Sequence, residues 1–211
     1  MIDRTQIPRK SIYRLSLYSR CLSRLVENKV ETVSSEALAK ATGVKPAQLR
    51  KDLTYLGNFG RRGLGYNVPE LLRRINETMG TNRLLPVALV GVGNLGSALL
   101  SYQGFAKEGF EIVAGFDIDP SRKRSKQLPI PIYPMAEMPE YVAKHDVRLA
   151  ILSVPGAVAQ EVTNELVKAG IQGILNFAPI LLQVPEDVAA NNVNLAIELE
   201  NLAYFIREPS V

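Results

Sequence analysis

One glycine-rich stretch, Gly91-Val92-Gly93-Asn94-Leu95-Gly96, decides the fold of this 211-residue chain. The apolar run 84–90 precedes it, and the helix-forming run 97–100 comes directly after it. A strand, a tight glycine turn and a helix are the setting in which G-x-G-x-x-G predicts a dinucleotide site. The first glycine permits the turn, the second lets the backbone approach a pyrophosphate, and the third allows close helix–strand packing. The stretch therefore predicts a parallel α/β sheet with the phosphates at the positive end of the following helix.

An acidic residue follows the second expected strand, as this kind of site requires. Asp117 ends the apolar run 111–116 and lies 26 positions after Gly91. A carboxylate there accepts hydrogen bonds from the adenosine ribose and disfavours a 2′-phosphate, so NAD(H) is favoured over NADP(H). The alternative interpretation is a strand-end turn residue that pairs with Ser121 or Arg122.

Two further apolar runs, 148–155 and 173–179, are expected to be strands, with a helix over 158–169 between them. Ligands of open parallel sheets bind at the carboxyl ends of the strands. The prolines there are also plain strand terminators, so this placement depends on the fold. The cofactor crevice is expected to include Ser153, Val154, Pro155, Asn176, Phe177 and Ala178.

The charge of the chain is unevenly distributed. Residues 1–80 contain 15 Lys and Arg against 7 Asp and Glu, a net charge of +8, whereas residues 81–211 contain 10 against 14, a net charge of −4. A basic module beside an acidic one predicts a polyanion partner for the first. The alternative is a basic solvated face that serves solubility alone.

The basic module has a helical pattern from Pro8 onward, and a second short helix is expected over 36–41, with Ser34 and Ser35 as N-cap candidates. Gly43 fits a helix C-cap or tight turn, and Pro46 fits the first turn of a third helix that runs to about Leu56. Two short helices joined through a glycine predict a helix-turn-helix.

The third helix has an apolar stripe of Leu49, Leu53 and Leu56, which leaves polar donors for the other faces. Asp52 is expected to pair with a basic neighbour rather than to contact DNA. The glycine- and arginine-rich loop 57–68 predicts a wing whose tip enters a minor groove. The DNA-binding residues are expected in the helix-turn-helix region, from about Leu17 to Leu56, and in this loop: Lys45, Gln48, Arg50, Lys51, Tyr55, Arg61 and Arg62.

The last segment, 194–206, has apolar residues spread widely around a helix, so it must be buried on more than one side. It is expected to pack on its own domain or on a partner subunit, and a two-fold dimer would suit DNA with inverted half-sites. The expected domains are residues 1–80 (winged helix), 81–190 (Rossmann-like) and 191–211 (dimerisation helix).

Several classes of protein are excluded by composition. The single cysteine, Cys21, allows no intrachain disulfide and no thiolate metal cluster, so no metal is expected. Cys21 is expected to be a small side chain buried by its helix. There is no long apolar run and no signal-peptide pattern, which predicts no membrane contact and a cytoplasmic location.

The chain resembles the bacterial redox-sensing transcriptional repressor Rex family in four motifs that occur in the same order: Lys45-Pro46-Ala47-Gln48-Leu49-Arg50-Lys51-Asp52-Leu53, Gly63-Leu64-Gly65-Tyr66, Gly91-Val92-Gly93-Asn94-Leu95-Gly96 and Asn176-Phe177-Ala178-Pro179. The resemblance implies a homodimeric winged-helix repressor whose Rossmann domain senses the NADH/NAD⁺ ratio. It implies that NADH releases the repressor from inverted-repeat operator DNA.

The resemblance also implies an exchanged C-terminal helix that begins near Asn194 and Leu195 and inserts between the two domains of the partner. It places Tyr102 near the nicotinamide and Arg20 at the junction that the partner's helix contacts. The family often has an aspartate where this chain has Asn194. A hydrogen bond to Arg20 stays possible there, but the ion pair does not.

Two rival functions share the cofactor motif. A small NAD-dependent reductase would need a proton donor near the nicotinamide. The only histidine, His145, is expected at the amino end of a strand, opposite the crevice, as a surface or capping residue, and no Tyr-x-x-x-Lys dyad follows the motif. The third interpretation is a CoA-ligase-like nucleotide domain recruited for another ligand. The sequence favours a sensor, not an enzyme.

Overall fold

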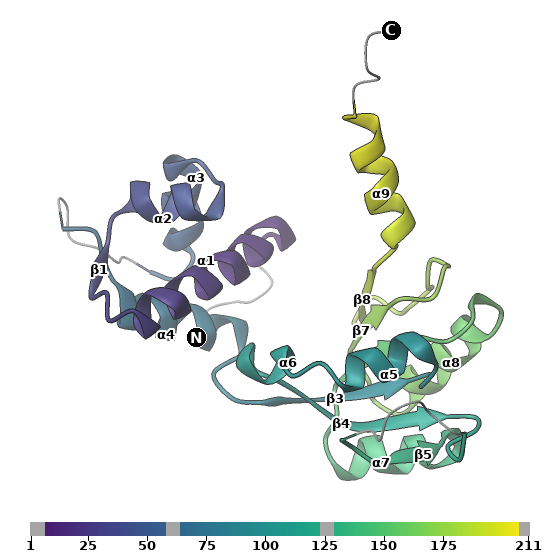
Figure 1. Cartoon of the computed structure of the whole chain (residues 1–211). Helices are drawn as coiled ribbons and strands as arrows, with labels where there is room; N and C mark the ends of the chain where they lie inside the picture. The colour runs from purple at the N-terminus through teal and green to yellow at the C-terminus, as the bar shows by residue number, and fades with distance from the viewer. Residues whose placement is uncertain (1–6, 58–63, 123–128, 207–211) are drawn as a thin grey trace, which may run out of the picture. The chain divides into compact units, whose positions relative to one another are not determined.

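The computed structural model describes residues 7–57, 64–122 and 129–206. The chain divides into two compact units, Met1–Arg83 and Leu84–Val211. Each unit has a hydrophobic core of its own, and Figure 1 labels most of their elements. No helix in the described ranges is both long and apolar enough to cross a membrane.

The described part of the first unit forms α1 (Arg9–Glu27), β1 (Thr32–Val33), α2 (Ser35–Thr42), α3 (Pro46–Thr54), β2 (Tyr66–Asn67) and α4 (Val68–Met79). Local signals set these bounds as expected. The Ser34 hydroxyl accepts a hydrogen bond from Ala37 N (3.0 Å) at the start of α2, and Gly43 ends this helix with φ +69°. Pro46 is the first residue of α3.

The core of the first unit joins α1 to α3 and α4 through a cluster of fully buried side chains. β1 pairs antiparallel with β2, which brings Tyr66 beside Val33. Gly65 has φ +79°, and a β-carbon there would clash with the Val33 carbonyl. The fully buried members of the cluster are Leu15, Tyr18, Leu22, Leu38, Ala39, Leu49, Val68 and Ile75.

The second unit is a parallel α/β domain, which confirms the predicted fold class. Its sheet has the order β5-β4-β3-β6-β7-β8, with all neighbours parallel. The elements are β3 (Leu85–Val90), α5 (Asn94–Leu100), α6 (Gly104–Lys107), β4 (Phe110–Asp117), β5 (Ile132–Pro134), the 3₁₀ helix η2 (Met135–Glu137), α7 (Met138–Lys144), β6 (Leu149–Leu152), α8 (Gly156–Lys168), β7 (Gly173–Asn176), β8 (Ala189–Asn192) and α9 (Leu195–Tyr204).

Helices cover the two faces of this sheet differently. Met138 and Val142 of α7 and Ala159 and Leu166 of α8 pack on one face. Leu100 of α5 packs on the other face, together with the partly buried Phe105 of α6. The strand order reverses between β3 and β6, and such a switch point is where open α/β sheets bind ligands.

The last helix, α9, has no buried residue. Figure 1 shows it as the yellow helix after β8. This helix therefore does not pack on its own domain, which was one of the two expected arrangements. The apolar side chains of α9 and of the two residues after it are more than half exposed: Leu195, Ile197, Leu199, Leu202, Tyr204, Phe205 and Ile206.

Candidate functional site

The glycine loop joins the carboxyl end of β3 to the start of α5. Gly91 has φ +89°, and its amide donates to the Phe116 carbonyl (2.8 Å). A β-carbon at Gly91 would lie 2.5 Å from the Ser153 carbonyl oxygen, and one at Gly96 would clash with the Gly91 carbonyl. The turn and the close packing of the chain on itself therefore require these two glycines.

Gly93 is the glycine that no protein contact requires. It is the N-cap of α5 with φ −75°, which other residues also adopt, and no protein atom lies within 4 Å of an added β-carbon. A glycine at this position leaves room for a ligand to come close to the backbone. The open space above Gly93 is where the motif predicts the pyrophosphate.

Asp117, the last residue of β4, faces this loop. Its Oδ2 accepts a hydrogen bond from Val92 N (2.7 Å), and its Oδ1 accepts one from Asp119 N (2.9 Å). The carboxylate is therefore oriented by the loop itself rather than by Ser121, whose hydroxyl donates to Asp119 (2.8 Å). Ile118 follows with 92% of its surface exposed, an apolar side chain at the same strand end that no sequence motif indicates.

The end of β6 is joined to the loop through Ser153. Its amide donates to the Val90 carbonyl (2.8 Å), and its hydroxyl donates to the Gly91 carbonyl (2.7 Å). Val154 packs against the core, and Pro155 is the exposed N-cap of α8. Ser153 thus supports the glycine loop from the neighbouring strand.

Asn176 ends β7 with a fully buried side chain. Its amide nitrogen donates to the Ile180 carbonyl (2.8 Å) and to Asn192 Oδ1 (2.8 Å), and its Oδ1 accepts from Ala178 N (2.8 Å). These bonds hold the turn after β7, and Phe177 N donates to the Leu152 carbonyl (2.8 Å). The sequence placed Asn176 at the right strand end, but its side chain supports the turn from within.

Tyr102 follows α5 and is 60% exposed. Its ring meets Phe105 edge to face, with centroids 5.1 Å apart, and lies against Gly104, where a β-carbon would clash with it. An aromatic ring that is exposed on one side and held by Phe105 and Gly104 on the other is suited to packing against a planar ligand.

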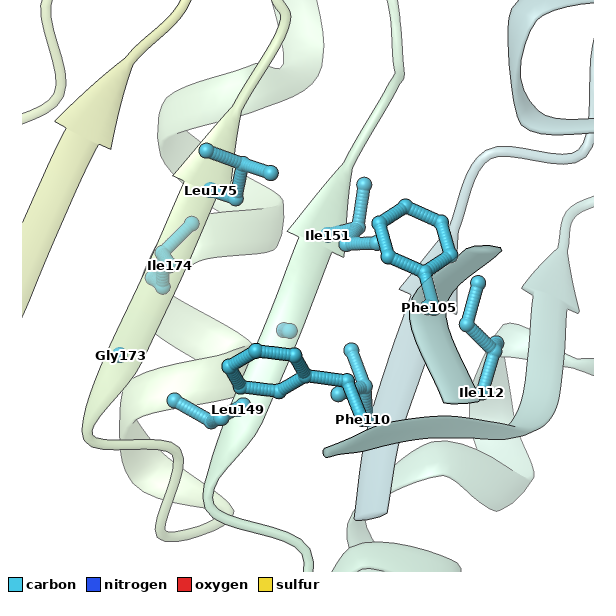
Figure 2. A pocket seen from close by; sticks show the side chains of 10 residues that line it. Phe105, Phe110, Ile112, Leu149, Ile151, Gly173, Ile174 and Leu175 are labelled. Atoms are coloured by element: carbon cyan, nitrogen blue, oxygen red, sulfur yellow. The ribbon is translucent and has the colours of Figure 1, made fainter. Parts of the chain in front are cut away.

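A separate cavity of about 300 Å³ lies on the α6 side of the sheet (Figure 2). Phe110, Leu149 and Gly173, the first residues of their strands, line it together with Phe105 and Ile151. Its lining is almost entirely apolar and extends to the amino ends of the strands. The cavity offers very little polar surface for phosphates or ribose, so it does not fit the nucleotide crevice.

The single histidine of the chain, His145, lies away from the carboxyl ends of the strands. His145 is the C-cap of α7 and stacks on Tyr141, with centroids 4.2 Å apart. It precedes β6 and so lies at the amino end of that strand, as predicted. In the described ranges, no three His, Cys, Asp or Glu residues are grouped closely enough to hold a metal ion.

Exposed basic residues lie on α3 and at its N-cap, and also on α1 and α4. Lys45, Arg50 and Lys51 are exposed, and Tyr55 is half-buried. Arg50 Nη1 donates to Ser35 Oγ (3.1 Å) and lies 3.5 Å from Glu36 Oε1, so α2 holds this guanidinium loosely. Arg61 and Arg62 of the expected wing lie outside the described residues.

Asp52 is fully buried and paired with a basic residue, as predicted. Arg14 on α1 donates to it through Nε (2.6 Å) and Nη2 (2.7 Å), Tyr18 through its hydroxyl (2.8 Å), and Gln48 through Nε2 (3.0 Å). Burial by itself would raise the pKa of the Asp52 carboxyl, but these hydrogen bonds outweigh it and hold that pKa below its ordinary value. Burial, followed by the hydrogen bond to Asp52, raises the pKa of Tyr18. Asp52 is therefore ionised at neutral pH, and Gln48 is not a free surface side chain.

Three further predicted residues lie on α1 and at the start of α9. Arg20 is exposed on α1, and Leu195 is 64% exposed. Asn194 is the N-cap of α9, and its Oδ1 accepts from Ala196 N (3.0 Å) and Ile197 N (3.3 Å). Half-buried Cys21 packs against the first core, and burial raises the pKa of its thiol, which is then protonated at neutral pH.

Comparisons with known proteins cover both units. Residues 82–180 match the family model described as CoA binding domain, and residues 6–54 match the one described as putative DNA-binding protein N-terminus. A redox-sensing transcriptional repressor Rex from Pelotomaculum thermopropionicum is 47% identical over 199 residues, 94% of this chain and 93% of the relative. One from Syntrophobacter fumaroxidans is 47% identical over 203 residues, 95% of this chain and 96% of the relative.

Solved structures agree with these sequence relatives. RSP in complex with β-NAD⁺ and operator DNA is 36% identical, with a TM-score of 0.86 over 94% of this chain and 91% of that one. RSP in complex with β-NADH is 34% identical, with a TM-score of 0.82 over 94% and 93%. A third structure of the same protein is described as a Rex-family repressor. By its two units, its glycine loop and these relatives, the chain belongs to the redox-sensing transcriptional repressor Rex family.

Proposed function

We propose that this protein is a DNA-binding repressor that senses the NADH/NAD⁺ ratio and leaves its operator when NADH binds. The observation that carries this proposal is the open space above Gly93 at the switch point of the sheet, in a chain whose first unit is a helix-turn-helix module. The relatives solved with β-NAD⁺ and operator DNA, and with β-NADH, support both ligands. A repressor of this kind acts on the bacterial chromosome, so we place it in the cytoplasm.

NAD(H) would lie across the carboxyl ends of β3, β4, β6 and β7. In this placement the pyrophosphate contacts the loop Gly91–Gly96, and the ribose hydroxyls of the adenosine donate to Asp117. Exposed Ile118 would pack against the adenine. The nicotinamide would lie near Tyr102, beside the strand ends 153–155 and 176–178. The main-chain amides of the loop and one carboxylate therefore supply the polar recognition.

DNA would bind to the first unit through α3. Recognition helices of this motif place their first residues on base edges in the major groove. Gln48, Arg50 and Lys51 are the residues proposed for that contact, with Lys45 and Tyr55 beside them. Arg61 and Arg62 are proposed to enter the minor groove as the tip of a wing, because a narrow minor groove attracts arginine.

A homodimer would explain why the apolar side chains of α9 are exposed. A large exposed apolar surface marks an interaction site, and two-fold dimers read inverted half-sites. We propose that α9 is exchanged between subunits and that Arg20 meets the start of the partner's α9. Asn194 Oδ1 already accepts two backbone amides, so this residue has little capacity left to accept from a guanidinium. Signal transmission at this junction would therefore depend on packing at Leu195 as well.

The redox state would be read through the charge of the nicotinamide ring. The reduced ring is neutral and the oxidised ring is cationic, so apolar surroundings near Tyr102 favour NADH. A ligand shifts a conformational equilibrium only by its differential affinity for the two states. If the NADH-bound dimer holds its two α3 helices at the wrong separation for the half-sites, the operator is released.

The decisive experiment measures binding of the protein to an inverted-repeat operator by fluorescence anisotropy at one fixed salt concentration. NADH is expected to weaken operator binding at concentrations at which NAD⁺ does not. Equal operator affinities with the two nucleotides would overturn the sensor mechanism. A control titration with non-specific competitor DNA separates operator binding from salt-dependent non-specific binding.

A CoA-type ligand is the second candidate, because residues 82–180 match the model described as CoA binding domain. Direct calorimetric titration separates the two ligands: tight NADH binding with no coenzyme A binding supports the sensor, and the reverse supports the rival. Steady oxidation of NADH with a panel of carbonyl substrates would instead indicate a reductase.

A further inference from the structure

The buried contact between α1 and α3 is built around one carboxylate. Asp52 is 0% exposed and accepts four hydrogen bonds, three from α1 side chains and one from Gln48. The two bonds from Arg14 are parallel and short, as in bidentate guanidinium–carboxylate pairs. Asp52 therefore fixes the rotation of α3 about its own axis relative to α1.

An ionised carboxylate can only accept hydrogen bonds, which decides the orientation of the Gln48 amide. The atom of Gln48 that lies 3.0 Å from Asp52 Oδ1 must be the nitrogen, because the opposite flip would bring two acceptors together. One Nε2 hydrogen of Gln48 is thereby used. In the described ranges, nothing donates to its Oε1.

The position of Gln48 on α3 is one from which base edges are read. Pro46 is the first residue of the helix, so Gln48 is the third and lies in its first turn. Gln48 is only half-buried, and Arg50 and Lys51 beyond it are exposed. An amide held in this orientation offers one acceptor, Oε1, and one remaining donor hydrogen on Nε2.

We infer that Asp52 is a positioning residue for base recognition: it holds the Gln48 amide so that Oε1 and the second Nε2 hydrogen face an adenine in the major groove. Adenine presents an amino donor at N6 and an acceptor at N7, which match this pair. Guanine presents two acceptors and has no donor for Oε1. This inference depends on the proposed function only in that α3 must enter the major groove.

The first test uses the wild-type protein and base analogues, so it does not depend on the folding of any variant. Each half-site position is substituted in turn, symmetrically in both half-sites, and operator affinity is measured by anisotropy. One A·T pair is expected at which guanine lowers the affinity by about tenfold or more. Purine, which lacks the N6 amino group, and 7-deazaadenine, which lacks N7, should each lower it at that same pair. Full affinity with both analogues at every adenine would overturn the inference.

The second test separates positioning from mere structural support. In Asp52→Asn the side-chain amide of Gln48 can adopt either of its two orientations. The preference of this variant for adenine should therefore fall at that one base pair. Gln48→Ala should lose the preference for adenine at the same pair. The matched control is Tyr18→Phe, which removes one hydrogen bond to Asp52 but should keep the preference for adenine. If Asp52→Asn lowers the affinity for every operator variant by the same factor, Asp52 has a structural role alone and the inference is overturned. Operator binding and NADH release by the wild type report separately on the proposed function.

Discussion

The same substitution by alanine at two glycines of one loop should have two different effects, one on stability and one on ligand binding. Gly91→Ala forces a side chain to adopt φ +89° and brings its β-carbon to 2.5 Å from the Ser153 carbonyl oxygen. The backbone conformation costs about 1–2 kcal/mol, and the contact about 1–3 kcal/mol more, because a backbone carbonyl must move. Gly93→Ala meets no protein atom within 4 Å and has an ordinary φ of −75°.

We therefore expect Gly91→Ala to lower the free energy of unfolding by about 2–5 kcal/mol, which is roughly 8–20 °C in Tm at about 4 °C per kcal/mol. Gly93→Ala should change the free energy of unfolding by less than about 0.5 kcal/mol. It should nevertheless raise the Kd for NADH by about 10- to 100-fold, because its methyl group occupies the space proposed for the pyrophosphate. That range corresponds to about 1.4–2.8 kcal/mol of binding free energy.

Thermal unfolding by circular dichroism without ligand and calorimetric titration with NADH measure the two effects. The reasoning is refuted if Gly93→Ala binds NADH as tightly as the wild type, because the open space would then have no ligand. It is also refuted if Gly93→Ala loses as much Tm as Gly91→Ala, because the protein itself would then require the glycine. Gly91→Ala serves as the matched control within the same loop.

Four further outcomes can be measured. Arg14→Ala leaves the buried Asp52 carboxylate without its guanidinium and should lower the unfolding free energy of the first unit by about 3–5 kcal/mol in urea titrations; an unchanged midpoint would contradict this. The pKa of Asp52 is lower in the folded chain, so its stabilisation is complete above the unfolded pKa, near pH 4, and is lost as pH falls through the folded pKa; urea titrations from pH 2 to 7 should show a smaller acid loss for Asp52→Asn than for the wild type. Asp117→Ala should weaken NAD(H) binding by about tenfold or more and narrow its preference over NADP(H); calorimetry with both nucleotides decides, and an unchanged ratio counts against the ribose contact. Leu199→Glu with Leu202→Glu should give a monomer in light scattering, and a dimer that survives both changes would exclude α9 from the interface.

The sequence was sufficient for the elements whose ends have a local chemical cause. The hydroxyl cap at Ser34, the left-handed Gly43 and the first-turn Pro46 mark the boundaries of α2 and α3 without any tertiary contact. The glycine loop was equally readable, because φ +89° and a close backbone approach at Gly91 exclude other residues. These features depend on neighbours a few positions away in the chain.

Other elements were not readable because distant partners decide them. β8 (Ala189–Asn192) has neither β-branched nor aromatic residues and forms only because β7 pairs with it. Asn176 was placed correctly at a strand end, but only the fold shows that its amide turns inward to Asn192 and Ile180. Gln48 was assigned to DNA as a free side chain, and no pattern on α3 indicates that a buried carboxylate holds it.

The hydrogen bonds from Ser153 to Val90 and Gly91 have a consequence for how the signal is generated. They tie the glycine loop to the end of the neighbouring strand, so the protein's own hydrogen bonds hold the loop proposed to bind the pyrophosphate. If the dinucleotide binds here as proposed, ordering this loop would consume little of the binding free energy, and both oxidation states would meet the same loop geometry. A loop held in this way would supply affinity for both oxidation states, so discrimination between them would fall to the residues around the proposed nicotinamide position near Tyr102.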